Sequence, residues 1–273
     1  MARRVSFSFV WASFASVKVK QNLFMKTINA IYALCALCAM PLISSCSDDD
    51  DDNDSFSVNP SSVSLNSLDT EQLTTDDGRI VTWSTSDDFV ATVDDNGLLK
   101  AVHVGEASVT ATDSKGATAV VSVTVEPKHN LYVEPCVKWG ISKDVLKGID
   151  KREIVTDDDD ALLLEAGGSA MRILYTFKDG ALNAAAVSVS LAYSSTLAEF
   201  LFERYEYLGQ YDDYFIFKDN KGLSVILSVT KSYLLVVYSA DASSKSLSVD
   251  PAEALSGILP ADVLASLPEQ LEL

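Results

Sequence analysis

The stretch "VTWSTSDDFVATVDDNGLLKAVHVGEASVTAT", residues 81–112, decides the fold of the first half of the chain. Apolar and polar residues alternate in it, as they do in a β-strand whose successive side chains point to opposite faces of a sheet. Val109, for example, lies between Ser108 and Thr110. Asp95-Asn96-Gly97 is a turn signal, because Asn and Gly tolerate the positive φ of tight hairpins. Short alternating strands with regular turns predict an antiparallel β-sandwich over residues 56–126.

The same stretch resembles the bacterial Ig-like domain of group 2. That family shows Trp-x-Ser, then V-A-T-V-D-x-x-G, then a G-x-A-x-V-T-A-T strand. The residues that match are Trp83, Val90, Ala91, Thr92, Val93, Asp94, Gly97, Gly105 and Ala107. The resemblance implies an Ig-like Greek-key sandwich, a spacer or adhesion module without catalytic residues, in which Trp83 belongs to the core. Residues 66–79 are shorter and more polar than the family pattern, so we expect distorted strands there.

The pattern changes to an α+β arrangement over residues 131–245. Residues 141–149 predict a helix with Ile141, Val145 and Ile149 on one face and Ser142 as N-cap. A second helix is predicted from a capping box formed by Thr196 and Glu199. Its apolar stripe is Leu197, Phe200, Leu201 and Leu208, and Gly209 ends it.

Strands follow each helix, and "YTFKDG" (175–180) and "FIFKDNKG" (215–222) take the same place in the two halves. We therefore expect two helix-plus-antiparallel-meander repeats that form one sheet with helices on one face. This topology resembles the tandem arrangement of β-lactamase-inhibitor-like proteins and small lipoproteins of outer-membrane assembly. Residues 246–273 are predicted to form short helical turns between prolines, as a C-terminal tail.

The N-terminus carries a processing signal. Lys26 precedes an apolar run over residues 28–43, which is shorter than the roughly 20 residues needed to span a bilayer. "LISSC" (42–46) resembles the lipobox of bacterial lipoproteins, which implies that residues 1–45 are removed and that Cys46 is acylated. We expect the true start at Met25, because residues 1–24 add a second apolar stretch ahead of a complete signal. The alternative is a cleaved secretory signal with an incidental cysteine.

An acidic run follows the cysteine and predicts an extended tether over residues 46–55, because like charges repel and cannot be buried. It resembles the export signal of Bacteroidetes lipoproteins that are sent to the outer face of the outer membrane. The residues of this signal would be Ser47, Asp48, Asp49, Asp50, Asp51 and Asp52. A plain solvated spacer is the alternative. The formal net charge of −18 disfavours binding to nucleic acid.

Candidates for chemistry are few. His103 and His129 are the only histidines, and no cysteine cluster, phosphate loop or nucleophile elbow occurs, so we expect no catalytic site, metal or cofactor. Asp157–Asp160 could hold Ca²⁺ but lacks the spacing of a calcium loop, and a solvated turn is the alternative. Cys136 is expected to be a small buried apolar residue.

Aromatic residues gather between residues 205 and 217. Tyr211 and Tyr214 are the predicted ligand-binding residues, because exposed tyrosines stack on sugars and protein surfaces. Packing of these tyrosines in the core is the alternative.

The sequence predicts a non-enzymatic lipoprotein of the outer membrane, exposed at the cell surface. Its Ig-like stalk would present a binding domain to a glycan or to a host or cell-surface protein, as in adhesion. An alternative is a periplasm-facing outer-membrane lipoprotein that acts as an assembly factor or enzyme inhibitor. A hydrolase with paired carboxylates stays open as a third interpretation, although spacing singles out no pair.

Overall fold

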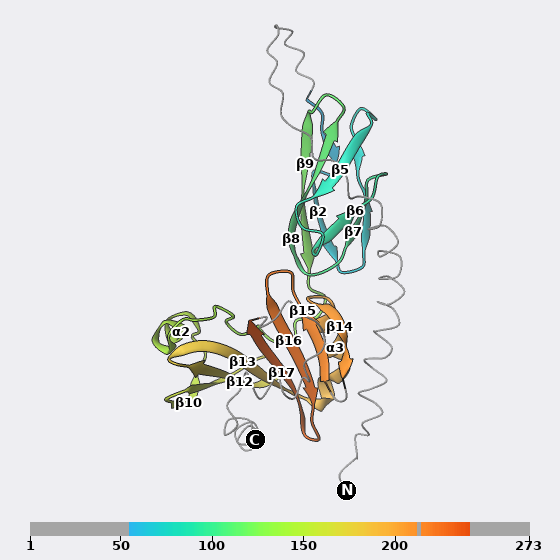
Figure 1. Cartoon of the computed structure of the whole chain (residues 1–273). Coiled ribbons are helices and arrows are strands. Elements are labelled where there is room, and N and C mark those ends of the chain that lie inside the picture. The colour runs from blue at the N-terminus through green and yellow to red at the C-terminus, as the bar shows by residue number, and fades with distance from the viewer. Residues whose placement is uncertain (1–54, 212–213, 241–273) are drawn as a thin grey trace. The chain divides into compact units, whose positions relative to one another are not determined.

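The structure, a computed structural model, describes residues 55–211 and 214–240 (Figure 1). The chain divides into two compact units, Met1–Glu126 and Pro127–Leu273, and each is treated by itself below. The signal, Cys46, the acidic run and the tail 246–273 lie outside the described residues. Within the described ranges, no helix combines the length and the apolar character that crossing a bilayer requires.

The first unit is a β-sandwich. Its four-stranded sheet has the order β2-β9-β8-β5, its three-stranded sheet has the order β3-β7-β6, and β1 pairs with β4. The strands are β1 Val58–Asn59, β2 Ser62–Asn66, β3 Thr70–Gln72, β4 Thr74–Thr75, β5 Val81–Thr85, β6 Ala91–Val93, β7 Leu98–Ala101, β8 Gly105–Asp113 and β9 Thr118–Glu126.

The alternation seen in the sequence produces the core of this sandwich. The inward residues of β8 and β9, such as Val109 and Val123, are at most 1% exposed. Trp83 is half-buried and packs against the same core. The expected antiparallel pairing holds except for β2, which runs parallel to β9. After Asn66, which ends β2, residues 67–79 contain only the short strands β3 and β4.

The second unit is built on one eight-stranded sheet in the order β10-β11-β12-β13-β17-β16-β15-β14, in which every pair is antiparallel. Two α-helices accompany it, α2 Lys143–Ile149 and α3 Ser194–Phe202, and the 3₁₀ turn η2 Leu191–Tyr193 precedes α3. The strands are β10 Ile154–Asp158, β11 Ala161–Glu165, β12 Ala170–Lys178, β13 Ala181–Ser190, β14 Glu206–Tyr211, β15 Tyr214–Lys218, β16 Leu223–Val229 and β17 Tyr233–Ala240.

Both helices lie over the same face of the sheet, here called the helix face. The ring of Phe202 in α3 lies 5.5 Å from Phe217 in β15. Lys143 in α2 lies over the ring of Phe177 in β12. The opposite face, here called the second face, carries a separate cluster of buried apolar side chains.

The second predicted helix is wrong in its bounds. α3 ends at Phe202, and Leu208 and Gly209 lie in strand β14 instead of at the helix end. Pairing with β15 overrides the helical pattern here, and a bulge between Tyr207 and Gly209 accommodates Leu208. Thr196 is not the N-cap either, because the helix continues from η2, whose own cap is Ser190.

Helix α2 forms where predicted, with Ser142 accepting a hydrogen bond from the backbone N–H of Val145 at 3.4 Å. The predicted buried face is wrong. Leu146 is fully buried, whereas Val145 is 50% exposed and Ile149 is 44% exposed. The aspartates of Asp157–Asp160 begin in a strand that was not predicted, β10, where Asp157 pairs with the ammonium groups of Lys143 and Lys147 from α2. These ammonium groups lower the pKa of Asp157.

Candidate functional site

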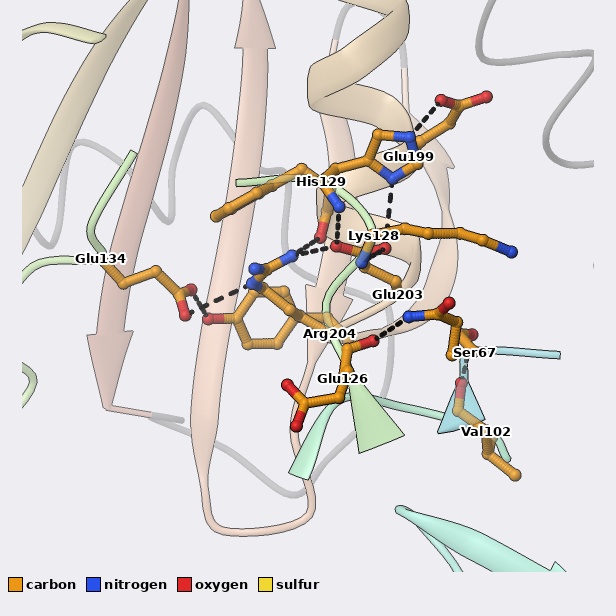
Figure 2. A network of polar contacts seen from close by, with 12 residues as sticks. Ser67, Val102, Glu126, Lys128, His129, Glu134, Glu199, Glu203 and Arg204 are labelled. Carbon is orange, nitrogen blue, oxygen red and sulfur yellow. Dashed lines mark hydrogen bonds and ion pairs between the residues drawn. The ribbon is translucent and has the colours of Figure 1, made fainter. Parts of the chain in front are cut away.

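A network of charged side chains joins the segment 128–134 to the end of α3 (Figure 2). Glu203 follows the last residue of the helix and is 6% exposed. Its carboxylate accepts hydrogen bonds from the backbone N–H groups of Lys128 at 3.2 Å and His129 at 3.0 Å. It also lies 2.5 Å from Nη1 of Arg204, whose guanidinium stacks on the ring of Phe200. The buried negative charge is therefore fully paired.

His129 lies between two carboxylates. Its Nε2 is 2.9 Å from Glu199, and its Nδ1 is 3.1 Å from Glu203 (Figure 2). Only the doubly protonated imidazolium donates a hydrogen bond from both ring nitrogens. The two contacts of the ring fasten the segment 128–134 to the last turn of α3.

Glu134 occupies the other end of the network. The hydroxyl of Tyr205 donates a hydrogen bond to Glu134, and Nε of Arg204 lies 3.7 Å from its second carboxylate oxygen. Burial raises the pKa of Glu134, and the hydrogen bond from Tyr205 and the charge of Arg204 only partly offset this effect. The side chain keeps 36% of its surface exposed, so water screens part of the shift.

Two further tyrosines lie beside this carboxyl. The hydroxyls of Tyr132 and Tyr238 are 2.7 Å apart and buried. Burial raises the pKa of Tyr205 and of Tyr238, and the charge of Glu134 adds to the effect in both. These hydroxyls stay protonated near neutrality and act as hydrogen-bond donors. They are typical of a structural polar network, since the partners they use belong to the fold itself.

A second polar cluster holds the next part of the same segment. Asp150 accepts hydrogen bonds from the hydroxyl of Tyr175 at 2.7 Å and from Nη1 of Arg152 at 2.6 Å. The backbone N–H of Cys136 donates to Tyr175, and Arg152 donates to the backbone oxygen of Val133. Both clusters therefore fasten the segment 128–136 over the helix face. Across the described parts of the chain, no group of three or more His, Cys, Asp or Glu side chains is placed to hold a metal ion.

The first unit contains a shallow groove of about 310 Å³. Ile80 on its rim is 93% exposed, and Trp83 forms part of its wall. Arg79 is held by Asp77 at 2.7 Å and by Asp113 at 2.8 Å. The groove combines an aromatic ring, an exposed aliphatic side chain and paired charges, and all of them belong to the first unit.

The predicted ligand-binding tyrosines lie on neighbouring strands. Tyr211 ends β14 and pairs with Tyr214, which begins β15. Tyr214 is half-buried and packs against the apolar cluster of the second face, and the side chain of Tyr211 lies outside the described residues. The ring of Tyr207 packs against both Phe202 and Phe217, at 5.4 and 5.3 Å, and burial raises its pKa to about 12.

The remaining candidates have structural positions. His103 is 8% exposed, stacks on Phe89 at 4.0 Å, and lies 2.8 Å from the backbone oxygen of Phe89. Cys136 is a free, half-buried thiol. Cys46, Ser47 and Asp48–Asp52 lie outside the described residues, so lipidation and export stay predictions.

Sequence reasoning did not find the network around Glu203 and Glu134. Two signals pointed to it: the charged pair Glu203-Arg204 directly follows an apolar helix, and Glu134 interrupts the apolar run "LYVEPC" (131–136). A charge in such a position is rarely buried without a partner. The sequence does not identify the partners, because Glu203 and His129 lie 74 residues apart and Glu134 and Tyr205 lie 71 residues apart.

The sandwich and its turns agree with a known family. Residues 53–125 match the bacterial Ig-like domain (group 2). The first unit contains a bacterial Ig-like domain. The prediction made from residues 81–112 is thereby confirmed. The chain is also similar to lacto-N-biosidase from Bifidobacterium bifidum, with 47% identity over 68 residues, and this match spans 23% of the chain and 6% of that protein.

Proposed function

We propose that this chain is a non-enzymatic lipoprotein of the bacterial outer membrane that is displayed at the cell surface. In this proposal the Ig-like domain is a spacer, and the second unit binds a glycan or a protein of another cell. Cys46 would carry the lipid, and Ser47 with Asp48–Asp52 would direct export. The Bacteroidetes type of lipoprotein fits both features. Support comes from the lipobox-like "LISSC" and the acidic run that follows it.

The exposed apolar residues of the second unit carry the proposal of binding. They concentrate in residues 133–155, around α2 and β10: Val133 is 74% exposed, and Val137, Val145, Ile149, Ile154 and Val155 are 39–50% exposed. Solvent-exposed apolar side chains that gather in one region mark interaction surfaces. The carboxylates of the polar network, by contrast, are engaged by partners of the fold, which favours binding over catalysis.

Two regions of the second unit are therefore candidates for the ligand. β10 and β14 are the opposite edges of the eight-stranded sheet. The region of Val145 and Ile149 lies by β10, and Tyr211 and Tyr214 lie at the β14 edge. Substitutions at the two edges can therefore be compared directly.

The experiment uses the chain secreted from Ser47 onward, without its lipid. It is screened against glycans and extracellular-matrix proteins, and the ligand found is titrated by surface plasmon resonance. We expect Val145→Ser with Ile149→Ser to weaken binding at least tenfold, and Val120→Ser to leave it unchanged. Val120 is a matched control because it is 59% exposed and lies on β9 of the Ig-like domain.

Two other outcomes would place the ligand-binding site away from Val145 and Ile149. A loss that is confined to Tyr211→Ala and Tyr214→Ala moves the site to the β14 edge. A loss with Ile80→Ser, in the groove of the Ig-like domain, contradicts the role of that domain as a spacer. The temperature of unfolding of each variant is measured in parallel, so that unfolding is not taken for loss of binding.

We also propose that the second unit is a doubled motif. α2 is followed by the strands β10 to β13 and α3 by the strands β14 to β17, and within each half the strands are neighbours in chain order. The two sets meet at β13 and β17. Duplication of a helix-plus-meander unit accounts for this symmetry.

A periplasm-facing assembly factor or enzyme inhibitor is the second candidate function. The exposed apolar residues would serve a protein partner equally well in that compartment. Protease treatment of intact cells separates the two: surface display predicts that the second unit is degraded, whereas a periplasmic orientation predicts protection until the outer membrane is opened.

A further inference from the structure

A continuous row of apolar side chains crosses the second face of the eight-stranded sheet. Each residue of the row is the cross-strand partner of the next, so their side chains lie on one face. From β11 to β15 the row consists of Leu163, Leu174, Ala186, Val237, Ile226 and Ile216.

Five residues of the row are buried and Ile216 is half-buried, although α2 and α3 lie over the opposite face. Leu163 is 4% exposed, Leu174 is 0% exposed and Val237 is 1% exposed. Every residue of this apolar cluster, including the half-buried Met171 and Tyr214 at its margin, comes from a strand of the sheet itself. A sheet face that packs against nothing leaves such side chains in contact with water. The cluster contains no described side chain from outside the sheet, so a segment beyond the described residues is the candidate cover.

The segment that follows the sheet has the pattern of such a cover. Residues 251–271 read "PAEALSGILPADVLASLPEQL". Leu255, Ile258 and Leu259 have the spacing of one helical face, and after Pro260 the pairs Val263–Leu267 and Leu264–Leu267 have the i, i+4 and i, i+3 spacings of another. Proline at the first position of a helix is favourable, so Pro251 and Pro260 mark two short helices.

Length and position also agree. Two helices of about eight residues are each about 12 Å long. Laid end to end they span about 24 Å, which is the width of six strands at about 4.8 Å per step. The chain leaves the sheet at Ala240, the end of β17, and β17 lies between β13 and β16 in the middle of the sheet. A short connection from this point reaches either half of the face at little cost in loop closure.

We propose that residues 251–271 fold back as two short amphipathic helices that cover the apolar row of the second face. The acidic side chains of the segment, Glu253, Asp262 and Glu269, then face water, and Leu255, Leu259, Val263 and Leu267 face the sheet. The second unit becomes a three-layer structure with a helical layer on each face of the sheet. The second face is then occupied by the chain itself, which leaves the edges of the sheet for ligands. The covering of this face does not depend on whether a ligand binds at the edges.

The first test maps the contact in the intact chain. A photo-crosslinking phenylalanine analogue replaces Tyr233, which is 6% exposed and belongs to the apolar cluster of the second face. A second version carries it at Tyr207, which packs on the helix face against Phe202. After irradiation, mass spectrometry should place the Tyr233 crosslink in residues 251–271 and the Tyr207 crosslink outside them. A Tyr233 crosslink to the N-terminal segment or to a second copy overturns the proposal.

The second test compares matched substitutions in the segment. Leu255→Asp with Leu267→Asp places charges on the apolar stripe that faces the sheet, and Ser256→Asp with Ser266→Asp adds the same charges on the polar side. We expect the leucine variant to raise the fluorescence of an apolar dye such as ANS several-fold and to lower the temperature of unfolding, and the serine variant to change neither. The proposal is contradicted if the two variants give the same dye fluorescence and the same temperature of unfolding. It is also contradicted if the protein is a dimer whose stability does not change in the leucine variant.

Discussion

Glu203 accepts two backbone hydrogen bonds and lies between Arg204 and His129, with 7% of its side-chain surface exposed. Replacing it by Gln keeps the shape but leaves the largely buried charge of Arg204 with only the more distant carboxylate of Glu134, at 3.7 Å. We expect Glu203→Gln to lower the free energy of unfolding by about 3 kcal/mol, the usual cost of breaking a buried ion pair.

Glu199 supplies the control for this measurement. It also contacts His129, but its side chain is 43% exposed. Glu199→Gln should cost less than about 0.5 kcal/mol, because solvent screens an exposed pair. Urea unfolding at neutral pH measures both variants, and equal losses would mean that burial does not govern the strength of this network.

Glu134 predicts a pH dependence of stability. Its pKa in the folded protein lies above the ordinary value of 4.5, so between these two values the folded state holds a proton that the unfolded chain has lost. Stability must therefore fall as the pH rises from 4.5 to the folded-state pKa, and stay level above it. In Glu134→Gln this contribution is absent, whereas all other titrations are retained.

The difference between the two proteins isolates the effect. We expect the free energy of unfolding of the wild type, minus that of Glu134→Gln, to decrease as the pH rises through this window. Urea titrations from pH 4 to pH 8 measure it. A difference that grows with pH would show that Arg204 and Tyr205 stabilise the carboxylate more strongly than burial opposes it.

At the scale of the element, the turn before β7 depends on a glycine. Gly97 has φ +79°, and a Cβ atom there would lie 2.6 Å from the backbone oxygen of Leu73 and 3.1 Å from the ring of Trp83. Gly116, in the β8–β9 turn, has φ +91° and open space around the same position. The two positions share the backbone strain and differ only in the clash.

Alanine at these positions separates the two effects. Gly116→Ala should cost about 1 kcal/mol, from the positive φ alone. Gly97→Ala should cost at least about 2 kcal/mol more, because the backbone of Leu73 or the ring of Trp83 must move. Thermal unfolding of the Ig-like domain in the full chain measures both variants. Equal costs would mean that Leu73 and Trp83 move away from the new Cβ atom at no measurable cost in free energy.

At the scale of the whole molecule, the proposed function rests on a lipid at Cys46. Cys46→Ala should abolish labelling by radioactive palmitate and leave the protein unprocessed or soluble. The substitution removes the residue that would carry the acyl chains, and more than one chain is needed for stable anchoring. Cys136→Ala is the control and should be labelled like the wild type. Continued labelling of the Cys46 variant would exclude this residue as the anchor.

The sequence by itself determined the Ig-like domain. Its signals are local: alternation at period two, a Gly97 turn and small residues at fixed spacing specify strands and faces within about 30 residues. It also predicted helix α2 and strands after each helix of the second unit, because these too follow from short-range periodicity.

Only the tertiary structure decided the rest. Residues 206–211 became an edge strand because pairing with β15 outweighs their helical spacing. Val145 and Ile149 stayed exposed because Leu146, between them, is the residue of α2 that meets the core. The polar network joins His129 to Glu203 and Glu134 to Tyr205, pairs 74 and 71 residues apart. No local pattern encodes such contacts, since a charge is paired only after the fold has brought its partner to it.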